Sequence, residues 1–355
     1  MKTEIVRVDR DHPDADAIAR AAACLRRGGL VAFPTETVYG LGVHALDRAA
    51  VLRLFEAKQR PANDPLIVHV ASIDAIVGLV AEVPGAAHQL AATFWPGPLT
   101  LVMRRAPTVP DEVTAGLDTV AVRVPSHPVA RALLEAARLP IAAPSANLFS
   151  RPSPTRAEHV LEDLDGRIDM IVDGGPTDVG VESTVVDVTV DPPVILRPGM
   201  LGIDTLRDVI PDLAQPPSPL RGVGGPGASG QPRSPGLLAK HYAPTAPLTL
   251  FRGDATAVTR ALRHAAQRAL AQRRRVGVLA TSGDVGMLRD LPVSLADLGP
   301  DDNMARIAAR LYAALRELDA QRVDVILARD PTGGDDLARA IRDRLQRAAA
   351  EVVDV

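Results

Sequence analysis

The residue types most able to do chemistry gather first in a short turn, Lys58-Gln59-Arg60-Pro61-Ala62-Asn63-Asp64-Pro65-Leu66. Lys58 and Arg60 stand at the end of an expected helix, where basic side chains also suit the negative end of the helix dipole. Pro61 and Pro65 restrict the turn and hold the two cations close together. Close cations repel, so the arrangement favours an anion between them, such as a carboxylate or a polyphosphate. A purely structural role at the helix end is the alternative.

Hydroxyl side chains, glycines and single basic residues recur where expected strands end. They occur in five further segments: Phe33-Pro34-Thr35-Glu36-Thr37-Val38-Tyr39-Gly40-Leu41-Gly42, Ala143-Pro144-Ser145-Ala146-Asn147, Pro152-Ser153-Pro154-Thr155, Gly180-Val181-Glu182-Ser183-Thr184 and Leu196-Arg197-Pro198-Gly199. Gly40 and Gly42 permit a close approach of the backbone. Each segment alone is also typical of an ordinary turn. Their recurrence predicts one shared cleft lined with hydroxyls and a few arginines.

The elements that position these segments are read from apolar periodicity. Helices are expected at residues 14–27, 47–58, 128–138 and 155–164, and strands at 30–33, 66–70, 99–103, 119–124, 168–172 and 184–188. A Thr155/Glu158 pair has the spacing of a capping box at the start of the last helix. This mixture of helices and strands predicts a twisted, open, mixed sheet with helices packed on it.

The last third of the chain has a simpler rhythm. Strands are expected at 248–251, 276–280 and 323–328, and helices at 255–272, 303–318 and 335–349. This βαβ pattern predicts a small Rossmann-like parallel α/β domain, and without a catalytic motif its expected role is regulatory or docking. Residues 211–236 hold seven prolines and six glycines, which disfavours regular structure there. We therefore predict domains over 1–210 and 247–355, joined by a linker over 211–246.

Composition excludes several classes of protein. The 355 residues are 46% hydrophobic and 23% charged, with a formal net charge of −3, which suits a globular protein and argues against non-specific nucleic-acid binding. The single cysteine, Cys24, excludes an internal disulfide and a multi-cysteine zinc site, and its helical position predicts core packing. The segment Met1–Arg10 lacks the apolar core of a signal peptide, and no apolar run reaches the length of a membrane span. We expect a cytoplasmic protein with no membrane contact.

No sequence motif supplies a phosphate-binding loop. The chain has no Walker motif, and the spacing in Gly222-Val223-Gly224-Gly225-Pro226-Gly227 follows no strand and opens no helix, so we interpret it as coincidence. Any phosphate binding must rest on discrete side chains.

Several of these segments together resemble one family. The segment from Phe33 to Gly42 and the Lys58-x-Arg60-Pro61 turn with Leu66-Ile67-Val68-His69 resemble the YrdC-like threonylcarbamoyl-AMP synthases. So do Phe94-Trp95-Pro96-Gly97-Pro98-Leu99-Thr100, Pro144-Ser145-Ala146-Asn147, Glu182-Ser183-Thr184-Val185-Val186-Asp187 and Leu196-Arg197-Pro198-Gly199. Ser234-Pro235-Gly236 and Lys240-His241-Tyr242-Ala243-Pro244 are similar to the longer, two-domain form of that family.

The resemblance implies a nucleotidyltransferase. Bicarbonate would carboxylate the amine of L-threonine, the carbamate would attack the α-phosphate of ATP, and pyrophosphate would leave. Threonylcarbamoyl-AMP would then pass to a separate transferase complex that modifies adenosine in tRNA. Mg²⁺ on the phosphates is implied as the cofactor, with no metal ligand assigned to a protein side chain.

The resemblance also implies site residues. L-threonine would be held by Thr37, His69, Arg123, the backbone of Ala143, and Ser183. ATP would be held by Arg60, Asp64, Thr119, Ser145, Ser153, Arg197 and Tyr242. Lys58 and Arg60 would be catalytic cations.

The end of the linker carries a further prediction about the site. Tyr242, bracketed by a proline turn, is expected to act as an active-site lid over the nucleotide. The alternative is that Tyr242 packs the linker against the second domain.

Two positions depart from the family pattern, and two other functions stay open. The family commonly has Asn at the position of Asp64, whose added charge needs Mg²⁺ or Arg60 to offset it, and Leu-Ser-Gly where this chain has Leu148-Phe149-Ser150. The other functions are an RNA-binding module, with a weak RNA contact also open for the synthase itself, and carbamoyl transfer in hydrogenase maturation. Low aromatic content and acidic balance disfavour the first, and the lone cysteine disfavours the second.

Overall fold

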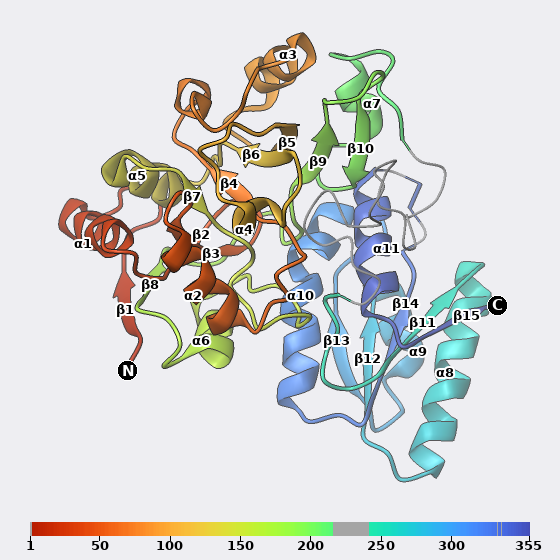
Figure 1. Cartoon of the computed structure of the whole chain (residues 1–355). Helices are drawn as coiled ribbons and strands as arrows, with labels where there is room; N and C mark the ends of the chain where they lie inside the picture. Colours follow the sequence, from red (N-terminus) through yellow and green to blue (C-terminus); the bar gives the residue numbers. More distant parts are fainter. Residues whose placement is uncertain (1, 216–240, 332, 335) are drawn as a thin grey trace. The chain divides into compact units, whose positions relative to one another are not determined.

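A computed structural model describes residues 2–215, 241–331, 333–334 and 336–355 (Figure 1). The chain forms two compact units. Met1–Phe149, Ser153–Asp178 and Glu182–Ala239 make the first, and Ser150–Pro152, Val179–Val181 and Lys240–Val355 make the second. Most of the predicted linker, with the glycine motif at 222–227, lies outside the described residues.

The first unit is built on a ten-stranded mixed sheet. In spatial order its strands are β1 (Glu4–Arg7), β8 (Met170–Asp173), β2 (Val31–Pro34), β3 (Tyr39–His44), β7 (Ile141–Ala142), β4 (Ile67–His69), β6 (Thr119–Arg123), β5 (Leu99–Arg104), β9 (Thr184–Asp187) and β10 (Val194–Arg197). β4 runs parallel to β6, and β5 runs parallel to β9 but antiparallel to β6. The predicted mixed sheet is confirmed.

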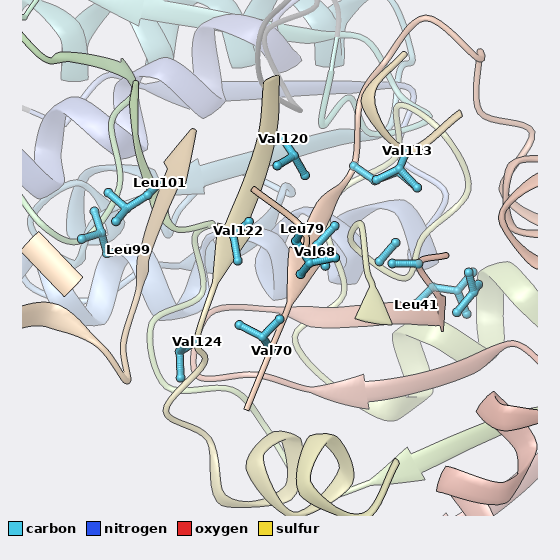
Figure 2. Close-up of a cluster of buried hydrophobic side chains, with 14 of the residues drawn as sticks. Leu41, Val68, Val70, Leu79, Leu99, Leu101, Val113, Val120, Val122 and Val124 are labelled. Carbon is cyan, nitrogen blue, oxygen red and sulfur yellow. The ribbon is translucent and has the colours of Figure 1, made fainter. Parts of the chain in front are cut away.

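Alternating side chains bury both faces of this sheet, because successive strand residues point to opposite sides. Val68, Leu101 and Val122 belong to one large apolar cluster, part of which is drawn in Figure 2. Their strand neighbours Ile67, Val102 and Ala121 belong to a separate cluster. The central strands are therefore packed on both faces. This packing also fixes the positions of the residues at their ends.

Helices cover the sheet; those at 15–26, 48–58, 128–137 and 157–164 lie near predicted positions, and the other helices of this unit are additional to the prediction. They are α1 (Ala15–Arg26), α2 (Arg48–Lys58), η1 (Ile73–Ile76), α3 (Gly85–Phe94), α4 (Asp111–Thr114), α5 (Pro128–Ala137), α6 (Ala157–Leu164) and α7 (Ile203–Arg207). α1 and α5 lie side by side (Figure 1) and bury Leu25 and Leu133 in one core together with Cys24, as predicted for the cysteine. The predicted Thr155/Glu158 capping box is wrong, because α6 begins two residues after Thr155, with Arg156 as an N-cap that makes no side-chain hydrogen bond.

The second unit holds a five-stranded parallel sheet, which confirms the predicted Rossmann-like pattern. Its spatial order is β13 (Ser294–Asp297), β12 (Val276–Ala280), β14 (Val325–Arg329), β11 (Leu248–Arg252) and β15 (Glu351–Asp354). Its helices are α8 (Ala255–Ala271), α9 (Ser282–Leu288), α10 (Met304–Ala320) and α11 (Asp336–Ala348). β13 and β15 are additional to the predicted strands. Within the described part of the chain, no helix has the length and apolarity that a bilayer crossing requires.

The first unit continues past the predicted domain end at residue 210. Leu213 is buried in its main core, and Ala214 forms an isolated bridge with Val194 of β10. The predicted division into a domain over 1–210, a linker over 211–246 and a domain over 247–355 stays a prediction.

Candidate active site

A turn between β2 and β3 places the first candidate residue, Thr37. The Thr35 hydroxyl donates to the Val38 carbonyl at 2.7 Å and lies 2.8 Å from the Thr37 hydroxyl. The backbone N–H of Thr37 donates back to the Thr35 hydroxyl oxygen at 3.2 Å. This local network holds the buried Thr37 side chain in one position.

Arg123 ends β6 and reaches this turn from the neighbouring part of the sheet. Its Nη1 donates to the Thr37 hydroxyl at 3.0 Å, and its Nε donates to the Gly97 carbonyl at 3.3 Å. Its Nη2 lies 2.7 Å from Oε1 of Glu36, and both side chains are buried. Oε2 of Glu36 accepts the N–H of Ser126 at 3.1 Å. One buried positive charge is thus balanced by one buried negative charge.

His69 ends β4 directly opposite Arg123 in the parallel register. Burial, with a further contribution from the nearby Arg123 charge, lowers the pKa of His69 to about 3. Its imidazole is therefore neutral at physiological pH, and its Nδ1 has no hydrogen-bond partner among the described residues. We call Glu36, Thr37, His69 and Arg123 the Arg123 cluster.

Ala143 follows β7, next to the Arg123 cluster. Its N–H donates to the carbonyl of Ile67 at 2.9 Å, which fixes the chain just beyond β7. A Cβ atom at Gly40 would lie only 3.3 Å from Cβ of Ala143, so glycine permits this close approach of β3. The predicted role of Gly40 is confirmed.

A second group forms around Arg60. The C-cap Gln59 has a left-handed conformation that turns the chain away from α2, and Nη2 of Arg60 then lies 2.8 Å from Oδ2 of Asp64, with both side chains buried. Nη2 also donates to the Pro65 carbonyl at 2.9 Å. Within the turn, Asp64 therefore supplies an anion for Arg60.

Lys58 is buried beside this pair. Its Nζ donates to the carbonyls of Ser145 and Asn147. Burial, with repulsion from Arg60, moves the pKa of Lys58 well below its ordinary value. Burial raises the pKa of Asp64, while the charges of Arg60, Lys58 and Arg197 act in the opposite direction. Lys58, Arg60, Asp64 and Arg197 are therefore close together, and we call them the Arg60 cluster.

Ser183 lies beside Arg197 of the Arg60 cluster. Nη2 of Arg197 donates to the Ser183 carbonyl at 3.0 Å and to its hydroxyl at 3.1 Å. The Ser183 hydroxyl also lies 2.7 Å from that of Thr100. A Cβ atom at Gly199 would fall 2.4 Å from the backbone nitrogen of Thr184, so only glycine allows this approach of the two strands.

The other candidate residues have different surroundings. Ser145 forms an isolated bridge with Gly40, and the Ser153 hydroxyl donates to Oε1 of Glu182 at 2.6 Å. Thr119 is buried at the start of β6. Tyr242 belongs to the second unit, where its ring is 5.5 Å from that of Tyr312 and is therefore engaged in packing. Its predicted contact with ATP stays a prediction.

The departure at Phe149 and Ser150 has a structural counterpart. Ser150 has φ of 67°, a left-handed conformation that glycine adopts most easily and that costs a serine about 1–2 kcal/mol. The backbone N–H of Phe149 donates to the Lys58 carbonyl at 2.9 Å, so this loop is tied to the Arg60 cluster. The backbone at position 150 thus keeps the left-handed conformation typical of glycine although the residue is serine.

Glu36 and Thr100 belong to the site but were given no role from the sequence. Glu36 lies in the segment from Phe33 to Gly42, just after a buried strand. A charged side chain at that position was the sequence feature that could have indicated its role. Thr100 is a buried hydroxyl within an otherwise apolar strand. Neither signal names a partner, because both partners are distant in the sequence.

Comparisons with known proteins identify the family. The Sua5/YciO/YrdC family model, described as telomere recombination, matches residues 23–199. A model described as the threonylcarbamoyl-AMP synthase C-terminal domain matches residues 203–350.

Similar curated proteins are named threonylcarbamoyl-AMP synthase. The one from Pyrococcus abyssi is 44% identical over 93% of both chains, and the one from Bacillus subtilis is 46% identical over 94% of this chain and 92% of its own. The crystal structure of P. abyssi Sua5 complexed with L-threonine matches with a TM-score of 0.91 and 43% identity, covering 99% of this chain and 100% of that one. The chain therefore belongs to the YrdC-like threonylcarbamoyl-AMP synthase family, in its longer two-domain form.

Proposed function

We propose that this enzyme makes L-threonylcarbamoyl-AMP from L-threonine, bicarbonate and ATP, with release of pyrophosphate. The observation that carries the proposal is the pair of buried clusters in one unit: Arg123 is paired with Glu36 in one, and three basic side chains lie around Asp64 in the other. The names of the full-length relatives and the L-threonine complex of the P. abyssi protein support it.

The Arg123 cluster suits L-threonine. A zwitterionic amino acid carries no net charge, so it suits a cluster in which the charge of Arg123 is balanced by that of Glu36. Arg123 and the Thr37 hydroxyl can bind polar groups of the ligand, and the neutral His69 can hydrogen-bond without adding charge. Ser183 and the backbone of Ala143 would complete this half of the site.

The Arg60 cluster suits the triphosphate of ATP. A carbamate oxygen of carboxylated threonine would attack the α-phosphorus, forming one P–O bond as the bond to the β-phosphate breaks and pyrophosphate leaves. Lys58, Arg60 and Arg197 would stabilise the charge that develops on the phosphate oxygens. Thr119, Ser145, Ser153 and Tyr242 complete the proposed ATP contacts, and Asp64 takes part as the partner of Arg60. This nucleotidyl transfer needs no covalent enzyme intermediate.

Burial of both clusters supports the chemistry of the carbamate. A carbamate is a weak nucleophile that readily loses CO₂, so close positioning and exclusion of water contribute more than a general base. The buried Arg123 and Lys58 side chains show that the polar groups lie in a low-dielectric environment. There, fixed charges act more strongly than they do in water.

Magnesium enters the proposal with the nucleotide. Among the described residues, no group of three or more His, Cys, Asp or Glu side chains is placed to hold a metal ion. Asp64 is already paired with Arg60, so it fits a counter-charge better than a metal ligand. Mg²⁺ is therefore proposed as part of the MgATP substrate, where it neutralises phosphate charge.

The proposed product is an activated intermediate for tRNA. A separate transferase complex would place the threonylcarbamoyl group on adenosine in tRNA, and the reaction would take place in the cytoplasm, where ATP, threonine and tRNA meet. A weak contact between this enzyme and RNA is compatible with that hand-over.

Pyrophosphate release from ATP with each of the twenty amino acids, with and without bicarbonate, tests the proposal. Release should require L-threonine and bicarbonate together. L-Serine should be poorer by roughly ten- to two-hundredfold in kcat/KM, because a missing methyl group costs about 1–3 kcal/mol of discrimination. Equal rates with serine, or full activity without bicarbonate, would contradict the assigned substrates. Filter binding of structured RNA, without any pyrophosphate release, would favour the RNA-binding alternative.

A further inference from the structure

Asp64 is the acidic side chain that pairs with Arg60 in the Arg60 cluster, while the buried Asp163 of α6 acts electrostatically on Lys58. The Asp64 side chain is completely buried, and its Oδ2 lies 2.8 Å from Nη2 of Arg60. The same Nη2 also donates to the carbonyl of Pro65 at 2.9 Å, and Nε of Arg60 donates to the backbone carbonyl of Asp64 at 3.3 Å. Asp64 is thus a fixed partner of Arg60 rather than a surface residue that happens to face it.

The charged neighbours of Asp64 come from separate elements. Lys58 ends α2, Arg60 follows that helix, and Arg197 ends β10. All three act electrostatically on the Asp64 carboxyl group. A buried set of cations without an anion would be strongly destabilised, because each charge loses its hydration and repels the others. Asp64 therefore stabilises the cluster when no other anion is present.

The same carboxylate opposes a phosphate. ATP would bring several negative charges to cations that Asp64 already partly neutralises, and like charges in a buried site repel. The family commonly has Asn here. An amide of the same shape carries no charge and can donate a hydrogen bond to a phosphate oxygen, whereas an ionised carboxylate can only accept one. The aspartate therefore changes the balance between the empty and the nucleotide-bound site.

We propose that Asp64 is a built-in counter-anion that competes with the phosphates of ATP for Lys58, Arg60 and Arg197. It stabilises the empty site and lowers the affinity for ATP. Acidification, which neutralises Asp64, then strengthens ATP binding. This inference rests on the proposed function, because it takes the Arg60 cluster as the phosphate site.

The test compares Asp64→Asn with the wild-type enzyme by calorimetric titration of MgATP in the absence of L-threonine and bicarbonate. The variant should bind ATP on the order of tenfold more tightly, since one buried negative charge has been removed near the phosphates. Its thermal midpoint without ATP should fall, and saturating ATP should raise that midpoint by more than it does in the wild type. Asp64→Ala removes the charge without adding an amide donor, so it should show a smaller gain in affinity than Asp64→Asn. If one of the two variants does not fold, the other measures the same loss of charge.

Asp284→Asn is the matched control. Asp284 in the second unit forms a buried pair with Arg329 at the same Oδ2–Nη distance of 2.8 Å, and it has no assigned role in ATP binding. This control should lose stability without gaining affinity for ATP. A similar gain in both Asn variants would show a general effect of lost charge and would overturn the proposal.

The pH dependence supplies a second readout. The ratio of the wild-type Kd to the Asp64→Asn Kd should fall towards one as the pH is lowered, because protonated Asp64 no longer competes. Taking the ratio cancels the titration of ATP itself. A ratio near one at all pH values, or weaker ATP binding by Asp64→Asn, would overturn the inference about Asp64. The proposed function fails separately, if wild-type enzyme releases no pyrophosphate with threonine and bicarbonate.

Discussion

The Arg123 cluster and the Arg60 cluster each bury an arginine–carboxylate pair, with N–O distances of 2.7 and 2.8 Å. Around Arg123, the remaining neighbours are neutral: a threonine hydroxyl, a backbone carbonyl and an uncharged imidazole. Around Arg60, the remaining neighbours include two further basic side chains, Lys58 and Arg197.

The difference in charge indicates which kind of ligand each cluster can bind. A cluster whose charges are balanced accepts a zwitterion without leaving a buried charge unpaired, whereas a cluster with several basic side chains suits a polyanion. A similar local pair thus serves two different ligands, and the surroundings of the pair decide which one.

Removal of Arg60 should have the largest effect on turnover. Arg60→Ala should lower turnover by about 10²–10³-fold, the usual cost of losing one group that stabilises transition-state charge. Arg60→Lys should recover only part of the rate, since a point charge cannot replace a bidentate fork. Pyrophosphate release at saturating substrates measures both variants, and near-normal turnover of Arg60→Ala would make the turn structural.

The same substitution should also destabilise the fold. A helix-end cation costs little when it is removed, but Arg60 lies beyond α2 and neutralises the buried Asp64. Leaving that carboxylate unpaired costs about 3–5 kcal/mol. Arg60→Ala/Asp64→Asn should regain much of this stability without regaining turnover, which separates the structural effect from the catalytic one.

Tyr242 tests whether ATP binding depends on a residue outside the Arg60 cluster. Tyr242→Ala should weaken ATP binding on the order of tenfold if the ring and hydroxyl contact the nucleotide, and leave L-threonine binding unchanged. Because Tyr242 packs on Tyr312, the alanine variant should also lose stability. Tyr242→Phe keeps the packing, so its ATP affinity isolates the hydroxyl. Wild-type ATP affinity in both variants would mean that Tyr242 does not contact the nucleotide and that the end of the linker only connects the two units.

His69 tests the description of the Arg123 cluster through stability rather than ligand binding. Because burial lowers its pKa to about 3, unfolding below pH 6.5 lets His69 take up a proton that it does not bind in the folded state. It should therefore reduce stability as the pH falls from about 6.5 towards 3, by at most about 1.4 kcal/mol per pH unit. Denaturant titrations of His69→Gln should show a shallower loss over that window than the wild type. Identical slopes would mean that His69 titrates normally.

Much of the fold could be predicted because local patterns specify it. The apolar periodicity of residues 47–58 and 128–138 and the apolar run at 119–124 reappear as α2, α5 and β6. The sequence predicts a turn rather than β3 after Pro34, because hydroxyl residues and glycines are typical of turns. In the structure a Cβ atom at Gly42 would lie 2.8 Å from side-chain atoms of Phe33 and Ile141, so this glycine serves packing inside a strand. Sequence alone does not distinguish that use of glycine from a turn.

The site was harder to predict than the fold, because its contacts join distant residues. Arg123 and Thr37 are 86 positions apart, and Arg197 and Ser183 meet only because β9 and β10 pair. The sequence suggested that cations in the turn needed an anion, and the structure identified it as Asp64, which the resemblance had assigned to ATP. The capping box failed because the N–H of Thr155 donates to Nδ1 of His159, and the helix begins after it.

The salt dependence of ligand binding tests the central comparison most directly. Calorimetric titrations of MgATP and of L-threonine, each alone, would be run from 0.05 to 0.5 M sodium chloride at constant free Mg²⁺. The Kd for ATP should rise about tenfold or more, because salt screens the attraction between a polyanion and surplus cations. The Kd for L-threonine should change by less than about twofold, since its cluster and its ligand are both balanced. Equal salt dependences for the two ligands would contradict the account.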